Sequence, residues 1–433
     1  MPPPMVTTGF LMFVGLIVVY SLVAARLEHL WVTGPIVFLL LGLLLSPEAL
    51  AVVDIGVLSE IVRVTAVVTL TLLLFSDAST VDLAALRRDA GTPMRLLLIG
   101  LPLTVLLGGV TAWLLLPTMA VGLWALTAAI LAPTDLSLGL AMFKNPRVPN
   151  RVRRELNVES GLNDGIVAPL ITLFIAVAIA DTEHTTGPVA EAVREIGLGA
   201  AAGIVIGVAG GLLLRRSKRS DWSSVASREF AALGLALLAY VGAVLIHGNG
   251  FIAAFVAGLA FGALARATAH AAARFSEETG TLLSLAVWFV FGAAVGPVLL
   301  HEGLQWRPIF YALLSLTVIR MVPVALALLG KEVHWSTTLF VGWFGPRGLA
   351  SVVFLLMALR SLEEAGIDTG LLLVTAGWTI FLSVILHGVS AGPVAAWYGR
   401  KAESFLPGSP ELGSVAEVHV RRGIATPSSH REA

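Results

Sequence analysis

Four polar residues within a six-residue stretch could together bind a small cation. Ser160 and Asp164 are four residues apart and Asn163 lies three after Ser160, so a helix places all three on one face. A hydroxyl, an amide and a carboxylate supply the oxygen ligands that hard cations such as Na⁺ prefer. Glu159 adds a second carboxylate, and no His or Cys accompanies the group. The plainer alternative is that these polar groups only join helices through hydrogen bonds.

Two further charged residues stand beside residues that interrupt helices. Asp135 follows Pro133, and Arg347 lies between Gly345-Pro346 and Gly348. Proline removes an amide donor and glycine loosens a helix, so each stretch predicts a broken helix. The freed carbonyls and half-helix ends of such breaks can face a central cavity. An ordinary proline kink is the alternative for each break taken alone.

The arginines inside apolar stretches need partners of their own. Glu159 is the natural partner of Arg320, which leaves Asp164 free to titrate. We expect Arg347 to stabilise its own broken segment by binding carbonyls at the C-terminus of a half-helix. Asp77 is interpreted as an interfacial cap, and His387, like two other histidines, is expected at a span end.

Composition indicates the medium in which these groups lie. Of 433 residues, 57% are hydrophobic and only 13% are charged, whereas soluble domains carry about 25% charged residues. A bilayer must solvate this much apolar surface. The net charge of zero argues against a nucleic-acid partner, and the absence of cysteine excludes disulfides and thiolate metal sites. The first residues hold no Lys or Arg, so we expect no cleavable signal peptide.

Apolar runs of about 20 residues predict membrane spans. Thirteen such runs occur, at 8–25, 31–47, 55–76, 93–116, 120–143, 157–180, 195–214, 229–246, 250–265, 280–300, 308–330, 336–359 and 367–398.

Positive charge tests this count. With the N-terminus outside, 22 of the 28 Lys and Arg fall in inside loops or the tail, three in outside loops and three within spans. This bias predicts an external N-terminus and a cytoplasmic C-terminus. The broken spans are the fifth and the twelfth, which fits two inverted six-span repeats around span 195–214. The basic loop 144–155 is read as a topology and lipid-headgroup signal. The polar segment 403–433 is predicted to be a short disordered cytoplasmic tail with no regulatory domain after it.

Four motifs resemble the NhaP/NHE branch of the monovalent cation:proton antiporters. They are APTD at 132–135, RVP at 147–149, LNVESGLNDG at 156–165 and GWFGPRG at 342–348, and their order and positions extend the resemblance over about residues 8–400. The resemblance implies an all-α polytopic membrane fold of about 13 transmembrane helices with inverted repeats and two discontinuous helices, of the NhaA/NhaP type. It also implies core-domain helices at about 93–180 and 308–398, dimer-domain helices at about 8–76 and 229–300, and a linking helix at 195–214.

The resemblance further implies a role for each motif residue. Asp164 matches the ion- and proton-binding carboxylate, and Asn163 matches its neighbour. Thr134, Asp135 and Ser160 match ion-coordinating or site-supporting positions, so transported Na⁺ is expected at Asp164, Ser160, Thr134 and Asp135.

Three more positions follow from the same comparison. Glu159 and Arg320 match a structural ion pair near the site, and Arg347 matches the arginine of the second broken helix. The Asn-Asp pair resembles that of electroneutral exchangers. The chain departs from the family's pattern at Phe143-Lys144-Asn145, where relatives often carry an acidic residue.

The sequence therefore predicts a plasma-membrane homodimer that exchanges Na⁺ or Li⁺ for H⁺ by alternating access, without a cofactor. Exchange of K⁺ for H⁺ is the nearest alternative, because ligand type alone does not set ionic radius. A proton-independent channel or a membrane sensor is disfavoured, since no filter-like repeat or charged ring occurs. An aspartyl-protease dyad of Asp135 and Asp164 is also disfavoured, because the flanking residues do not resemble such enzymes.

Overall fold

Every regular element that the structure describes is a helix. The computed structural model describes residues 4–57, 59–81, 91–139, 142, 145–183, 187–265, 269–301 and 305–413. Arg87, Arg88, Lys144 and Arg266, which entered the charge count, lie outside these residues, as does the predicted tail beyond residue 413.

Nine helical segments of the described chain are long and apolar enough to cross a membrane. They are α1 (Pro4–His29), α3 (Glu60–Thr80), the run of α5 (Gly91–Arg95), η1 (Leu96–Gly100) and α6 (Leu101–Leu115), α9 (Asn150–Glu183), α10 (Gly187–Arg219), α11 (Val225–Leu245), α13 (Ala269–His301), the run of α14 (Trp306–Leu316) and α15 (Val318–Leu328), and α18 (Gly370–Ala402). Three shorter apolar helices are α2 (Gly34–Leu45), α7 (Val121–Ile130) and α12 (Gly250–Ala265). Each of the thirteen predicted ranges overlaps one helix or consecutive helices of the described chain.

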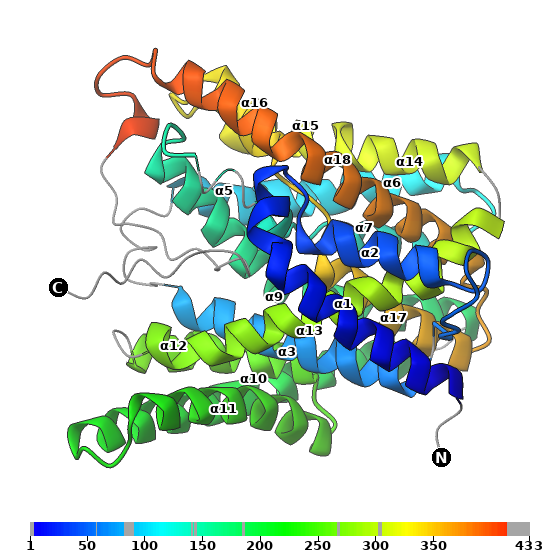
Figure 1. Cartoon of the computed structure of the whole chain (residues 1–433), viewed down its shortest axis with the longest axis horizontal. Coiled ribbons are helices and arrows are strands. Elements are labelled where there is room, and N and C mark those ends of the chain that lie inside the picture. The colour runs from blue at the N-terminus through cyan, green and yellow to red at the C-terminus, as the bar shows by residue number, and fades with distance from the viewer. Residues whose placement is uncertain are drawn as a thin grey trace.

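The helices pack as two groups with α9 between them. In one group α2 and α3 contact α13, and α10 and α11 contact α12; in the other α6 contacts α7, and α14 contacts α18. Figure 1 shows α10, α11 and α12 side by side at one edge, with α6, α14, α15 and α18 at the other. Helix α9 contacts both α7 and α10, so it joins the two groups.

Both predicted interruptions are present as short non-helical segments. Helix α7 ends at Ile130, and residues 131–135 precede the short helix η2 (Leu136–Gly139). Helix α16 (Trp335–Trp343) ends before residues 344–348, and α17 (Leu349–Glu364) follows. We call these segments the first break (131–135) and the second break (344–348).

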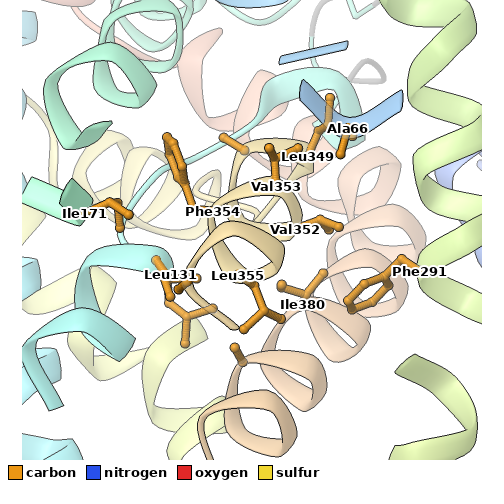
Figure 2. Packing of buried hydrophobic residues seen from close by; sticks show 14 of the residues in the cluster. Ala66, Leu131, Ile171, Phe291, Leu349, Val352, Val353, Phe354, Leu355 and Ile380 are labelled. Atoms are coloured by element: carbon orange, nitrogen blue, oxygen red, sulfur yellow. The ribbon is translucent and has the colours of Figure 1, made fainter. Parts of the chain in front are cut away.

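Helix α17 lies at the centre of the packed core. Val352, Val353, Phe354 and Leu355 are consecutive and all buried, which means that α17 is covered on every side. Figure 2 shows these residues among side chains from α3, α9, α13 and α18. The second break is therefore followed by a helix that its neighbours hold firmly.

Two features depart from the expected pattern. The predicted span 308–330 is interrupted at Thr317, which the sequence did not indicate. Thr317 has non-helical backbone angles (φ −119°, ψ −91°) and separates α14 from α15. Residues 403–413 of the predicted disordered tail are folded, and they end in the short helix η4 (Pro410–Leu412). Within η4 the side chain of Glu411 is buried.

Candidate functional site

The two breaks cross each other, and Asp135 joins them. The amide of Asp135 donates to the carbonyl of Pro346 over 2.8 Å. Its Oδ2 accepts from the amide of Leu349 over 3.2 Å. The first amides of a helix have no partner within that helix, so Asp135 caps α17 from the other break. A Cβ added at Gly348 would collide with the Asp135 side chain, which is why this position needs glycine.

Arg347 makes the reciprocal contact. Its Nη1 donates to Ala132 O over 3.1 Å, in the first break just after α7. Its Nη2 donates to Ser315 O over 2.9 Å, a carbonyl next to the interruption at Thr317. We expected Arg347 to stabilise the broken helix of its own span by binding carbonyls at the C-terminus of a half-helix. It does bind carbonyls near half-helix ends, but neither carbonyl belongs to its own span. The guanidinium instead satisfies carbonyls near the ends of α7 and α14, because the crossing of the breaks brings those ends to it.

Ser160 and Asn163 hold the first break against α9. Ser160 Oγ donates to Thr134 O over 2.8 Å. Asn163 Nδ2 donates to Thr134 Oγ1 over 2.7 Å and lies 3.3 Å from Thr134 O. The structure thus brings together Thr134, Ser160 and Asn163, with Asp164 next along α9.

The carboxylate oxygens of Asp164 and Asp135 differ in their hydrogen bonding. Both carboxylate oxygens of Asp135 accept amide hydrogen bonds, Oδ1 from Ser137 and Oδ2 from Leu349. By contrast, Asp164 Oδ1 and Asn163 Oδ1 are buried and have no hydrogen-bond partner among the described residues. Buried polar oxygens normally have a partner. Two such oxygens from adjacent residues are suited to bind a cation, and Asp164 can also take a proton.

The Asp135 carboxylate lies close enough to Asp164 for their charges to interact. Two neighbouring carboxylates repel each other when both are charged, and a bound cation or proton relieves that repulsion.

Glu159 and Arg320 form a buried ion pair behind the site. Arg320 Nη1 lies 2.7 Å from Glu159 Oε1, and both side chains are at most 3% exposed. Gly345 leaves room for this arginine, since a Cβ added there would lie 2.5 Å from Arg320 Nε. The pair links α9 to α15 directly beside the second break.

His387 is a site neighbour that sequence reasoning misplaced. We expected it at a span end, but it is buried within α18. Its Nε2 lies 3.0 Å from Trp343 O, at the end of α16. Its Nδ1 lies 3.3 Å from Ser383 Oγ, which accepts from the amide of Arg347. The spacing of Ser383 and His387, four residues apart on a helix, was the available signal.

Asp77 lies at the end of α3, close to α9. It is partly exposed in the last turn of α3. A Cβ added at Gly161 would lie 3.7 Å from Asp77 Cβ, so α3 and α9 approach closely one turn from Asp164.

Exposure along the face of α9 that carries Asp164 is one-sided. Toward the start of α9, Ser160 and Asn157 follow Asp164 on the same face, and all three are partly exposed. Toward its end, the same face carries buried apolar residues, namely Val167, Ala168 and Ile171. We call the side on which α9 and α16 begin and α18 ends the carboxyl-terminal face. Partial exposure along this face of α9 therefore continues from Asp164 toward the carboxyl-terminal face and stops toward the opposite one.

A cavity of about 360 Å³ opens between α3, α11 and α17. Charged residues at the start of α3 and at the end of α17 line it. Ala66 and Val353 belong to its lining, and Leu70 and Leu349, the next residues inward on α3 and α17, are buried. An apolar layer therefore separates this cavity from the site.

Comparison with known proteins places these features in a family. The family described as "Sodium/hydrogen exchanger, transmembrane" matches residues 12–397. The Na(+)/H(+) antiporter of Schizosaccharomyces pombe is 25% identical over 281 residues, which is 58% of this chain and 58% of that protein. The K(+)/H(+) antiporter NhaP of Alkalimonas amylolytica is 23% identical over 393 residues, 89% of this chain and 66% of that protein. The chain thus spans about three-fifths of the length of these relatives.

A solved structure shares the fold. The sodium proton antiporter MjNhaP1 from Methanocaldococcus jannaschii at pH 8 superposes with a TM-score of 0.70 at 24% identity, covering 88% of this chain and 99% of that one.

Proposed function

The chain belongs to the sodium/hydrogen exchanger family, and we propose that it exchanges Na⁺ or Li⁺ for H⁺, one for one, at Asp164. The observation that carries this proposal is a pair of buried oxygens, Asp164 Oδ1 and Asn163 Oδ1, that have no hydrogen-bond partner among the described residues and lie beside two crossed helix breaks. The family is one of multi-pass membrane transporters and not of enzymes.

Competition for one carboxylate couples the two ions. A cation and a proton each neutralise Asp164, and a neutral site crosses an apolar barrier at lower cost than a charged one. The empty, charged form crosses poorly, so each crossing carries one ion or the other. Ser160, Thr134 and Asp135 complete or support the cation site in this proposal. Asn163 adds no charge, which favours one proton per cation.

The one-sided exposure along α9 supports alternating access. We infer thirteen spans in two inverted repeats. The core domain, 93–180 and 308–398, moves against the dimer domain, 8–76 and 229–300, while helix 195–214 links them. The packing of the helices into two groups supports this division. The movement opens the apolar layer at Leu70 and Leu349 and closes the path beside Asn157.

The same proposal assigns orientation and assembly. The distribution of Lys and Arg supports an external N-terminus and makes the carboxyl-terminal face cytoplasmic. The partial exposure from Asp164 to Asn157 then corresponds to an inward-facing state. We propose a homodimer in the plasma membrane, formed by the dimer domain.

Exchange in proteoliposomes tests the role of Asp164. Asp164→Asn should abolish the Na⁺-induced dissipation of a pH gradient, because the amide can neither take a proton nor balance a cation. Asp181→Asn is a matched control, since Asp181 is exposed in the same helix. Near-normal exchange by Asp164→Asn would contradict the proposal.

Exchange of K⁺ for H⁺ is the second candidate, because relatives that this chain matches at 23–25% identity bear that name. Titrating Na⁺, Li⁺ and K⁺ separately against one pH gradient distinguishes the two. Cation flux without any change in pH would instead indicate a channel.

A further inference from the structure

The residues that follow α18 provide a helix cap for α16. Glu411 is 3% exposed. Its Oε1 accepts from the amide of His334 over 2.7 Å and from Thr337 Oγ1 over 2.9 Å. His334 is the N-cap residue of α16, and its own side chain makes no cap hydrogen bond. From 77 residues away along the chain, Glu411 therefore satisfies the amide of the N-cap residue, as the N3 carboxylate of a capping box does locally.

The charge of Glu411 matches the position that it occupies. The N-terminus of a helix carries partial positive charge and amides without a partner. Hydrogen bonds to a buried carboxylate are stronger than those between neutral groups. Thr337 extends this cap into α18, because its Oγ1 lies 2.9 Å from the hydroxyl of Tyr398. Since Thr337 donates its proton to Glu411, Tyr398 is the donor in that second bond.

Aromatic rings continue the contact from the cap toward the site. Phe405 stacks on His334 with ring centroids 4.8 Å apart. Tyr398 stacks on Phe340 at 4.1 Å, and Phe340 contacts Phe344 at 4.5 Å. Phe344 is the first residue of the second break. Its ring packs against η2, since a Cβ added at Gly139 would lie 3.2 Å from it. A continuous row of rings thus runs from residue 405 to the segment next to Asp135.

Residues 403–413 also contact α9. Glu403 lies 3.1 Å from Arg147, just before α9, although both side chains are 57% exposed. Helix η4 packs against α9 itself. Figure 1 shows this red segment at the end of the molecule beyond α18 and beside α16. It therefore contacts α9, α16 and α18, which all belong to the proposed core domain.

We propose that residues 403–413 form a clamp on the carboxyl-terminal face, and that Glu411 is a positioning residue that holds α16, and through it the second break, in the conformation that transports. The inference rests on the proposed exchange function for its effect on transport. The cap itself is independent of that function. Glu411 acts through α16 and touches no transported ion.

Hydrogen exchange in α16 tests the cap without reference to transport. Glu411→Ala should raise the exchange rates of amides 334–337 about ten- to a hundredfold, the effect of losing hydrogen bonds to a buried charged group. Glu411→Gln keeps an acceptor oxygen but not the charge, so a smaller increase is expected, and it serves if the alanine variant does not fold. Glu403→Gln is the control and should change these amides less than twofold, because its ion pair is exposed. Unchanged protection in Glu411→Ala would overturn the proposal.

Transport by the folded fraction separates positioning from simple stability. Per folded molecule, Glu411→Ala should lower the maximal exchange rate at least threefold, while the cation concentration at half-maximal rate stays within twofold, because no ligand oxygen is removed. Thr337→Val should add little to Glu411→Ala, since both remove the same contact. An unchanged rate, or a faster one as expected of an inhibitory contact, would overturn the positioning role. If the unaltered protein shows no exchange, the proposed function fails while hydrogen exchange still tests the clamp.

Discussion

Two sets of paired charges in this protein use the same chemistry in opposite surroundings. Glu159 and Arg320 meet at 2.7 Å with side chains at most 3% exposed. At the rim of the cavity between α3 and α17, Arg360 lies 2.9 Å from Glu364 and 3.4 Å from Glu60, with all three side chains 46–66% exposed. Arg63 pairs with Glu60 on the same rim.

The two sets differ in how much stability is lost when one member of a pair is removed, and not in the geometry of the pairs. Removing one member of a buried pair leaves an uncompensated charge at low dielectric, which is strongly destabilising. An exposed pair exchanges its partner for water and contributes little. We therefore expect the buried charges near the breaks to support the fold of the site, and the rim charges to be dispensable for it. Four substitutions test that contrast.

Arg320→Ala should have the largest effect. It strands the Glu159 carboxylate in the core, and we expect a loss of about 3–5 kcal/mol. The melting temperature and the folded yield in detergent measure it. Replacing both Glu159 and Arg320 by Met should cost less than the sum of the two single replacements, because no charge is then left unpaired. Additive losses would show that the two residues do not stabilise each other.

Arg347→Met should rank second. It removes the donors that satisfy Ala132 O and Ser315 O in a fully buried place, and we expect a loss of about 2–3 kcal/mol. Exchange per folded molecule should also fall, because Ala132 belongs to the break that carries Thr134 and Asp135. Arg307→Met, on the exposed start of α14, is the control for loss of a positive charge. Equal melting temperatures for the two variants would refute the capping role.

Ser383→Ala should have a moderate effect. Ser383 Oγ accepts from the amide of Arg347 over 2.6 Å, and one net hydrogen bond is worth about 1 kcal/mol. Thermal melting measures this loss. Ser21→Ala removes an exposed hydroxyl bonded only within its own helix and should leave the melting temperature unchanged. A loss as large as that of Arg347→Met would mean that Ser383 has a role beyond this bond.

Arg360→Gln should have the smallest effect. The rim pairs are exposed, so we expect a change of about 0.2–1 kcal/mol that shrinks as salt rises from 0.05 to about 1 M. Melting temperatures at low and high salt measure it, and the Arg320→Ala effect serves as the salt-independent reference. A large loss that persists at high salt would erase the contrast between the two sets of charges.

Local rules sufficed for part of the site. Ser160, Asn163 and Asp164 share a face of α9 because helix geometry fixes their spacing, and the positions of Pro133 and Pro346 marked both breaks. Charge balance suggested that Arg320 meets Glu159. These inferences needed only the period of a helix, the chemistry of proline and the cost of charge in an apolar medium.

Other contacts depended on partners that are distant along the chain. A break frees carbonyls and amides but does not say which side chain will satisfy them, so Arg347 was assigned to its own span while its partners lie in the first break and at Ser315. The interruption at Thr317 had no proline or glycine to mark it. Residues 403–413 were predicted to be part of a disordered polar tail, because nothing in the neighbouring sequence indicates that Glu411 is buried.

The sequence alone determined that this protein is a multi-pass membrane protein of the exchanger family, where its helices lie, and which charges lie within them. Those properties follow from hydrophobicity, helix period and local helix breakers. Only the tertiary structure decided that Asp135 caps α17 while Arg347 binds the carbonyl of Ala132, and that Glu411 caps α16. It also decided that Asp164 keeps a buried oxygen with no partner in the described part of the chain. Each of these depends on which helix ends meet in space, and side-chain packing across the whole chain sets that.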